Sequence, residues 1–324
     1  MESKVKTIGV LTSGGDAPGM NAAVRAVVRS ALRKGIRVLG IRRGYNGLMN
    51  CDMMEMDERS VSNIINQGGT ALYTARCPEF KGEEGIARGV ATCKEAGIEG
   101  LVVIGGDGSF RGARDLSLAG IPCIGIPGTI DNDIVCTDYT LGYDTALNTA
   151  MEAIDKLRDT CQSHDRCSVV EVMGHHCGDI ALNIGIACGA TAVLLPEKSY
   201  DVDADIITRI ENTRKTGKKH FIIIVSELMM DVHALAKEIE AKTGIETRAT
   251  VLGHILRGGA PSVRDRVTAT KMGHHAVELL SQGIGNRVVV EENSKITDYD
   301  ILEGLKMPRK FDEETYQILR EVNI

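Results

Sequence analysis

The chain has no tryptophan, and aromatic residues make up only 3% of its 324 residues. Proteins that bind single-stranded nucleic acids commonly stack bases on aromatic side chains and present a basic surface. Here acidic residues outnumber basic ones, 44 to 38, and the formal net charge is −6. The composition therefore argues against a nucleic-acid-binding protein.

Long apolar runs are also absent. The longest uninterrupted apolar stretches resemble Phe221–Val225, far short of the ~20 residues that cross a bilayer. Residues 1–6 lead directly into an apolar stretch and lack the apolar core of a secretory signal. The nine cysteines are an odd number without a C-x-x-C pair, which favours a reducing compartment. We therefore expect a cytoplasmic protein with no membrane segment.

Short apolar segments alternate with longer helical patterns along the whole chain. Apolar residues make up 43% of the sequence, and its length suggests about two domains of ~150 residues each. The strand candidates lack polar alternation, as expected for strands buried on both faces of a parallel sheet. They are Thr7–Leu11, Ile36–Ile41, Leu101–Ile104, Pro122–Ile126, Cys167–Met173, Ala192–Leu195, Phe221–Val225, Ala249–Leu252 and Arg287–Val290.

Amphipathic segments lie between these strands. Apolar or small residues recur at helical spacing over 21–34, 144–161 and 232–243, and Gly35 and Gly244 follow two of these segments. The alternation predicts an α/β, doubly wound architecture with crossover helices. We expect two α/β lobes with a cleft between them, with ligands bound beyond the carboxyl ends of the strands.

A glycine-rich segment, TSGGDAPGMN, follows the first predicted strand from Thr12 to Asn21. Glycines let the backbone pass close to a ligand, and the helix behind them directs N–H groups at an anion. The segment matches neither the P-loop pattern nor the dinucleotide-binding fingerprint. It indicates a phosphate site, with a tight strand-to-helix turn as the structural alternative.

A second segment, IGGDGSF, spans Ile104–Phe110 and places Asp107 among glycines, with Ser109 able to cap the next helix. A carboxylate repels a phosphate unless a cation lies between them, and Mg²⁺ is typically held by one or two carboxylates plus phosphate oxygens. Asp107 is therefore a candidate Mg²⁺ ligand, and a simple turn residue is the alternative.

A third segment, IPGTIDND, places two carboxylates and an amide after the strand that ends near Ile126. Asp and Asn favour turns because they bond their own backbone and tolerate unusual dihedral angles. The functional alternative is that one carboxylate takes a proton from a substrate hydroxyl during phosphoryl transfer.

Basic side chains lie near further glycine-rich segments. Arg76 lies in YTARCPEF, and Arg248, His254 and Arg257 lie in ETRATVLGHILRGG. Arginine binds phosphate bidentately, although a single arginine is more often a solvated surface charge. A strand followed by glycine and two histidines also occurs in EVMGHHCGD, Glu171–Asp179.

These segments together resemble the 6-phosphofructokinases of the bacterial ATP-dependent type. The similarity runs in order from about residue 5 to past residue 300, through GVLTSGGDAPGMNAAVR, GGTALYTAR, VVIGGDGS, PGTIDNDI, DYTLGYDTA, SVVEVMG, ETRATVLGHI and RGG. The resemblance implies transfer of the γ-phosphoryl group of MgATP to the 1-hydroxyl of fructose 6-phosphate. It also implies two Rossmann-like three-layer αβα lobes: residues 1–138 with about 251–302 for ATP, and 139–250 with about 303–324 for fructose 6-phosphate.

The resemblance assigns a role to individual residues of this sequence. Asp131 matches the general base, with Thr129 and Asp133 beside it, and Asp107 matches the Mg²⁺ carboxylate. Arg76 and His175 complete the residues matched to the chemical step. The nucleotide site is matched by Gly15, Tyr45, Arg76, Cys77, Gly106, Asp107, Gly108 and Ser109. The sugar-phosphate site is matched by Thr129, Ile130, Asp131, Arg166, Met173, Gly174, His175, Glu227, Arg248, His254 and Arg257.

The family resemblance also implies a homotetramer, because the counterparts of Arg166 and Arg248 reach the active site of a neighbouring subunit. Pyrophosphate-dependent relatives usually carry Asp at the position of Gly108 and Lys at the position of Gly128. The two glycines leave room for a nucleotide, so we expect ATP rather than pyrophosphate as donor.

Several positions depart from the family pattern. His175 stands where Arg is common, and histidine, with an ordinary pKa near ~6.5, loses its charge at neutral and alkaline pH. The ADP or phosphoenolpyruvate effector site is matched in part, but Glu58, Thr191 and Thr216 replace an expected Arg, Glu and Lys, so we expect weakened or altered control. The matched effector residues are Arg25, Arg29, Arg158, Lys218, Lys219 and His220.

Three alternatives remain beside the ATP-dependent enzyme. A pyrophosphate-dependent enzyme would differ in its donor, and His175 raises the possibility of a weakly active regulatory subunit. A non-catalytic subunit would need none of the matched catalytic residues, so their retention argues against the latter: Asp107, Thr129, Asp131, Asp133 and Arg76. A lipid or dinucleotide kinase would not explain the arginines near residue 250.

Overall fold

The computed structural model describes residues 3–323, which form two compact units. The first unit runs to Thr145 and includes Arg257–Arg309, and the second consists of Ala146–Leu256 and the residues from Lys310. The expected boundaries after residues 138, 250 and 302 lie a few residues before the observed ones. The ligands assigned to each lobe stay predictions.

A seven-stranded sheet forms the centre of the first unit, in the order β11-β10-β5-β4-β1-β2-β3. Its five inner strands run parallel, whereas β3 and β11 are antiparallel strands at the two edges. The strands are β1 (Thr7–Ser13), β2 (Arg37–Ile41), β3 (Met53–Met56), β4 (Gly100–Gly105), β5 (Cys123–Pro127), β10 (Arg287–Glu292) and β11 (Lys295–Asp300).

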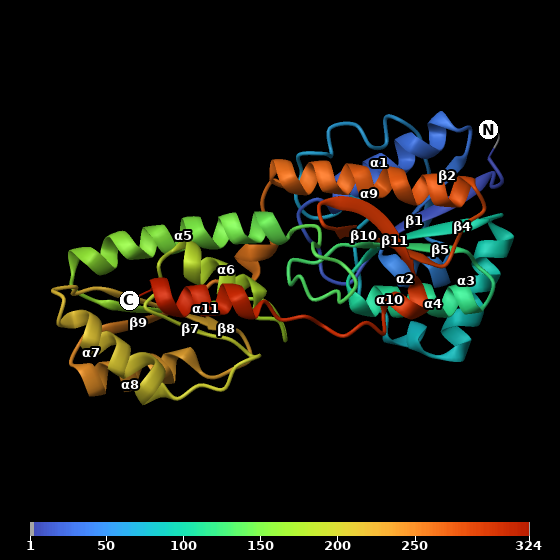
Figure 1. Cartoon of the computed structure of the whole chain (residues 1–324). Coiled ribbons are helices and arrows are strands. Elements are labelled where there is room, and N and C mark those ends of the chain that lie inside the picture. The colour runs from blue at the N-terminus through green and yellow to red at the C-terminus, as the bar shows by residue number, and fades with distance from the viewer. Residues whose placement is uncertain (1–2, 324) are drawn as a thin grey trace. The chain divides into compact units, whose positions relative to one another are not determined.

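Helices cover both faces of this sheet (Figure 1). Helices α1 and α9 lie side by side on one face, and the remaining helices cover the other. Apolar side chains such as Leu11, Leu48, Phe80 and Phe110 fill the core on that second face. The helices are α1 (Met20–Arg33), α2 (Gly44–Met49), α3 (Glu83–Glu95), α4 (Asp107–Leu118), α9 (Val263–Ser281) and α10 (Ile301–Gly304), with a 3₁₀ turn at Pro78–Lys81.

The second unit has a four-stranded parallel sheet in the order β7-β8-β6-β9. Helices α5, α6 and α11 lie on one face of this sheet, and α7 and α8 lie on the other (Figure 1). The strands are β6 (Cys167–Val172), β7 (Ala192–Leu194), β8 (Phe221–Ser226) and β9 (Thr247–Val251). The helices are α5 (Tyr143–Ser163), α6 (Asp179–Ala187), α7 (Thr208–Arg214), α8 (Val232–Thr243) and α11 (Glu313–Val322), with a π-helical turn at Asp203–Ile207 and a 3₁₀ turn at Gly253–Arg257.

The predicted α/β class with mostly parallel sheets is confirmed, and all nine predicted strands are present with ends shifted by at most two residues. Two strands, β3 and β11, were not predicted. Each lies at a sheet edge and carries exposed polar side chains, so neither produces an uninterrupted apolar run. Among residues 3–323, no helix is both long and apolar enough to cross a bilayer.

Candidate functional site

The three glycine-rich segments of the first unit lie together because they follow β1, β4 and β5, which are neighbours in the sheet. Their backbones approach closely: the N–H of Gly128 donates to the carbonyl of Gly105 at 3.0 Å. A Cβ on Gly105 would lie 2.5 Å from the Ser109 hydroxyl. Only glycine at position 105 permits this approach. The three candidate ligand-binding segments therefore lie close together at one edge of the sheet.

The first segment leads into α1 through Gly19, whose φ of 104° lies in the left-handed region. No side chain caps α1, so its first N–H groups point out of the helix toward the glycine segment. The guanidinium of Arg257 covers Gly15 so closely that a Cβ there would overlap it, and it donates to the Asp16 carbonyl at 3.5 Å. Positive charge and free N–H groups thus converge here.

Residues 70–76 are bound to this first segment. The Thr12 hydroxyl donates to the Tyr73 carbonyl at 2.9 Å, and the Thr74 hydroxyl donates to the Gly14 carbonyl at 2.6 Å. Arg76 follows in the chain, is exposed, and has no ion-pair or hydrogen-bond partner within residues 3–323. Its guanidinium is therefore available to an anionic ligand. Cys77 is half-buried, and burial raises the pKa of its thiol.

The second segment begins α4 earlier than the sequence suggests. Helix α4 starts at Asp107 with Gly106 as its cap residue and no side-chain cap, so the expectation that Ser109 caps this helix is wrong. Ser109 is instead buried in the first turn, because the close approach of Gly105 places its hydroxyl beneath the loop. Uncapped N–H groups at this helix start form a second anion-binding feature.

Asp107 points away from the core, with 44% of its side chain exposed. Its carboxylate accepts a hydrogen bond from the Nε of Arg111 at 2.8 Å, an i,i+4 pair that sequence reasoning missed. A Cβ on the neighbouring Gly108 would meet no atom within 4 Å. An accessible carboxylate beside open space and free N–H groups fits a Mg²⁺ ion shared with phosphate oxygens.

Tyr45 lies beneath α4 rather than on its open side. Its ring stacks on Phe80 with centroids 4.1 Å apart, and its hydroxyl donates to the Ser109 carbonyl at 2.5 Å. Burial raises the pKa of Tyr45 well above its ordinary value, so it remains a neutral donor. Tyr45 therefore supports the start of α4, a role that its match to the nucleotide site does not suggest.

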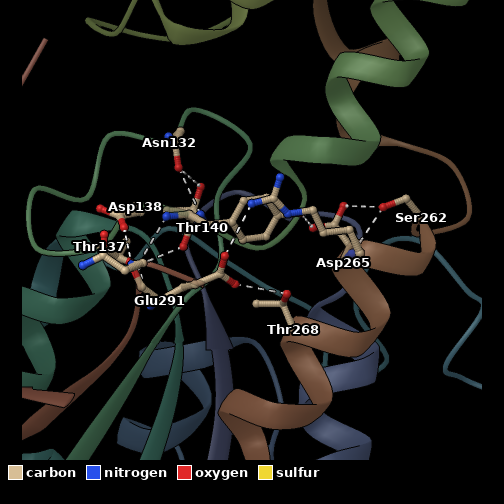
Figure 2. Close-up of polar contacts among 11 residues, drawn as sticks. Asn132, Thr137, Asp138, Thr140, Ser262, Asp265, Thr268 and Glu291 are labelled. Atoms are coloured by element: carbon tan, nitrogen blue, oxygen red, sulfur yellow. Dashed lines mark hydrogen bonds and ion pairs between the residues drawn. The ribbon is translucent and has the colours of Figure 1, made fainter. Parts of the chain in front are cut away.

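The third segment presents Asp131, which is only 9% exposed. The Thr129 hydroxyl donates to the Asp131 carboxylate at 3.2 Å. Asn132 adopts a left-handed φ of 52°, and its side-chain oxygen accepts hydrogen bonds from the N–H and the hydroxyl of Thr140 (Figure 2). The turn interpretation is therefore confirmed for Asn132, and a catalytic role of Asp131 stays a prediction. Ile130 is buried and Asp133 is half-buried.

In the second unit, Met173, Gly174 and His175 follow β6. Gly174 and His175 both have positive φ, 150° and 54°, and their N–H groups both donate to one carboxylate oxygen of Glu227, at 3.1 and 2.8 Å. Glu227 therefore holds a strained turn in place. Met173 is buried, whereas the His175 ring is exposed and lies 4.2 Å from that of His176.

Arg166 immediately precedes β6, and Arg248 lies on β9, an edge strand of the second sheet that pairs with β6. Both donate to the carboxylate of Glu246, at 2.8 and 2.5 Å. The hydrogen bond from Arg166 is the main cause that holds the pKa of Glu246 below its ordinary value. Sequence analysis did not identify Glu246 as a site residue, although it lies two residues before Arg248 in the segment ETR. His254 is exposed.

The six candidate effector residues fall into two groups. In the second unit, burial lowers the pKa of Lys218 and of His220, and the charge of Arg158 adds to both effects. Arg158 itself donates to the Cys188 carbonyl, and Lys219 pairs with Asp165 at 3.7 Å. Arg25 and Arg29 lie on α1 of the first unit.

Comparison with known proteins identifies close relatives. The phosphofructokinase family matches residues 7–280. The chain is 56% identical over 314 residues to the ATP-dependent 6-phosphofructokinase of Clostridium botulinum, covering 97% of this chain and 98% of that protein. It is 54% identical over 320 residues to the enzyme of the same name from Bacillus subtilis, covering 99% and 100% of the two chains.

Solved structures share the fold. A phosphofructokinase from Saccharomyces cerevisiae superimposes with a TM-score of 0.87 at 32% identity, covering 98% of this chain and 47% of the yeast chain. This chain therefore spans about half the length of the yeast chain. A pyrophosphate-dependent phosphofructokinase from Marinobacter aquaeolei gives a TM-score of 0.85 at 22% identity, covering 96% and 86%. At that identity the similarity shows the fold alone.

The surroundings of Gly108 and Gly128 predict that larger side chains at these positions change the unfolding free energy to different extents. Gly108→Asp should change the unfolding free energy by less than about 1 kcal/mol, because the site is open and an acid suits a helix N-terminus. Gly128→Lys should lose about 2 kcal/mol, because its Cβ would lie 3.1 Å from Met20 and 3.2 Å from Ile104. Urea unfolding of both variants measures this, and equal losses would contradict the described packing.

Proposed function

The chain belongs to the phosphofructokinase family, and we propose that it transfers the γ-phosphoryl group of ATP to the 1-hydroxyl of fructose 6-phosphate. The products are fructose 1,6-bisphosphate and ADP. The observation that carries this proposal is the placement of the buried Asp131 carboxylate at the same sheet edge as two uncapped helix starts. A proton acceptor thus lies beside a phosphate-binding surface.

Asp131 accepts the proton of the attacking hydroxyl. The Thr129 hydroxyl orients one carboxylate oxygen at 3.2 Å, and the Asn132 turn prevents the loop from moving away. A base held in place before the substrate arrives contributes to the rate because no reorganisation is needed at the moment of proton transfer. Asp133 lies on the same turn as the second carboxylate of the site.

Cations and N–H groups of the first unit bind the polyphosphate. The exposed Arg76 supplies positive charge that stabilises the negative charge on the transferring phosphoryl group. The starts of α1 and α4 supply N–H donors, and the glycines let the phosphates approach them. These residues act by position and charge rather than by covalent chemistry.

Asp107 would hold Mg²⁺, and Arg111 would release that carboxylate or share it. When bound, Mg²⁺ neutralises charge on the β- and γ-phosphates. Tyr45 and Ser109 keep Asp107 at the start of α4, because their hydrogen bond fixes the first turn of the helix.

Residues of the second unit bind the sugar phosphate. Arg166, Arg248 and His254 suit the 6-phosphate, as does Arg257 from the first unit. The Glu227 carboxylate, together with Met173 and Gly174, suits the sugar. Arg166 and Arg248 share Glu246 at a sheet edge, and in the proposed homotetramer they reach the site of a neighbouring subunit. With this activity, we expect the enzyme to act in glycolysis in the cytoplasm.

Pyrophosphate is the second candidate donor. The open space at Gly108 favours ATP, because a nucleotide needs room beside the phosphates that pyrophosphate does not. The unpartnered Arg76 and the oriented Asp131 also favour an active enzyme over a regulatory subunit.

We expect turnover with Mg²⁺, fructose 6-phosphate and ATP, and none with pyrophosphate. Asp131→Asn should lower kcat by about 10³-fold, because a base is replaced by a side chain of the same size that cannot take the proton. Asp138→Asn is the matched control, since this exposed acid lies seven positions along the same segment and its carboxylate accepts a hydrogen bond from the Asn293 N–H. Formation of fructose 1,6-bisphosphate measures each rate.

The outcomes separate the alternatives. Turnover with pyrophosphate would show that Gly108 and Gly128 do not decide the donor. No turnover of the wild-type chain with either donor would overturn the proposal in favour of a regulatory subunit. An Asp131→Asn variant as active as Asp138→Asn would remove Asp131 from its role.

His175 predicts a pH-dependent rate. Arginine keeps its charge throughout the working pH range, whereas a histidine side chain exists in a charged and a neutral form. The kcat of the wild type should therefore fall relative to that of His175→Arg between about pH 6 and pH 9, by up to about 10²-fold if the charge contacts the transferring group. Parallel pH profiles would show that position 175 carries no catalytic charge.

Control by ADP or phosphoenolpyruvate should be weakened or altered. Arg158, Lys218 and His220 supply positive charge in the second unit, and Arg25 and Arg29 supply it on α1. The exposed Glu58 stands where an Arg is expected, and a lost Arg and an added Glu both weaken binding of a phosphate effector. Thr191, which replaces an expected Glu, is buried.

A further inference from the structure

Asp265 lies in the first turn of α9, three residues after the cap residue Ser262. This spacing is that of a capping box, in which the acid would reach back to the N–H of the cap residue. Here the Ser262 N–H donates instead to the Thr145 hydroxyl at 2.9 Å. The Asp265 carboxylate is therefore directed away from its own helix, toward residues 139–145 (Figure 2).

Five donors surround the Asp265 carboxylate, which is 0% exposed. One oxygen accepts from the Tyr139 hydroxyl at 2.5 Å and the Gly142 N–H at 2.7 Å. The other accepts from the N–H and the hydroxyl of Thr145, at 3.0 and 2.5 Å, and from the Ser262 hydroxyl at 3.5 Å. Because backbone N–H groups only donate, both oxygens must act as acceptors. A buried acid with this many donors fixes the segment that supplies them.

Residues 139–145, here called the strap, pack between two of the candidate ligand loops. Gly142 has a φ of 100°, and a Cβ there would lie 2.8 Å from the Ala17 side chain and 3.2 Å from Ile130. Gly19 of the first loop also lies against Asp265, because a Cβ on Gly19 would be 3.4 Å from the Asp265 Cβ. Movement of the strap would therefore shift both loops.

The strap also connects to Asp131 through hydrogen bonds. Thr140 donates from its N–H to the Asn132 side chain at 3.0 Å and from its hydroxyl to the Thr129 carbonyl at 2.7 Å. Thr129 in turn donates to the Asp131 carboxylate at 3.2 Å. The chain of contacts from Asp265 to Asp131 thus lies wholly within the first unit.

We propose that Asp265 is a positioning residue for phosphoryl transfer, which holds the strap so that Thr140 fixes Asn132 and Asp131 before substrates bind. It touches no reacting atom and acts through Asp131. This inference rests on the proposed function, because it concerns the rate of that reaction.

Asp265→Asn tests the proposal, because it keeps the size of the side chain but replaces one acceptor oxygen with an NH₂ group. We expect kcat to fall by about 10- to 100-fold, since a small misplacement of a catalytic group costs that much. Asp298→Asn is the matched control. Asp298 is a largely buried acid on edge strand β11 that binds His275 at 2.8 Å and Arg287 at 2.5 Å. The Asp298→Asn substitution should lower the midpoint of urea unfolding, while kcat per folded enzyme stays unchanged.

Measuring Asp265→Asn in the Asp131→Asn background distinguishes a positioning role of Asp265 from a general loss of structure. In Asp131→Asn, the base is already absent, so adding Asp265→Asn should change the residual rate by less than about twofold. A purely structural role would lower the rate by the same factor in both backgrounds. Thr140→Val provides an independent variant if Asp265→Asn fails to fold, because it breaks the link to Thr129 without altering the Asp265 carboxylate.

Three results would overturn the inference: wild-type kcat in folded Asp265→Asn, wild-type kcat in Thr140→Val, or equal losses in the two backgrounds. Each is distinct from failure of the proposed function, which would show as an inactive wild type. The inference is supported if Asp265→Asn lowers kcat in the wild-type background but not in the Asp131→Asn background, and if Asp298→Asn is as active as the wild type.

Discussion

Hydrogen bonds from residues 139–145 to the buried Asp265 carboxylate underlie the arrangement of the candidate site. Burial raises the pKa of this acid, and the donors around it act in the opposite direction. Tyr139, Gly142 and Thr145 provide donors that satisfy this carboxylate in the core, and the carboxylate in turn holds these three residues. This mutual dependence makes the loops beside Asp131 part of the core.

Hydrogen bonds also hold other positions with strained backbone angles. Asn132, Gly142, Gly174 and His175 all have left-handed backbone angles, and each lies where a peptide or side chain is held by hydrogen bonds. In the second unit Glu227 performs for Gly174 and His175 what Asp265 performs for the strap. Acidic side chains therefore serve two purposes in this protein. Some face ligands, and others hold the backbone that presents those ligand-facing groups.

Much of the fold was predictable because parallel strands buried on both faces leave uninterrupted apolar runs in the sequence. The edge strands β3 and β11 leave no such run, since Glu55 interrupts the first and Lys295, Asp298 and Asp300 interrupt the second. The loops that carry the candidate site were predictable from their glycines and acids. Their supports were not: Arg111, Glu246 and Asp265 act through contacts that no local pattern encodes, and the capping-box spacing of Ser262 and Asp265 suggests the wrong partner.

The hydrogen bonds to Asp265 should order the strap and the Asp131 turn before any ligand binds. Hydrogen–deuterium exchange of the ligand-free protein, followed in peptides that cover residues 129–145, measures this order. We expect the Gly142 and Thr145 amides to exchange as slowly as those in the middle of α9, because both are bound to a carboxylate with no solvent access. Exchange as fast as that of the exposed segment 199–201 would contradict this expectation, since the turn would then form only when a ligand arrives.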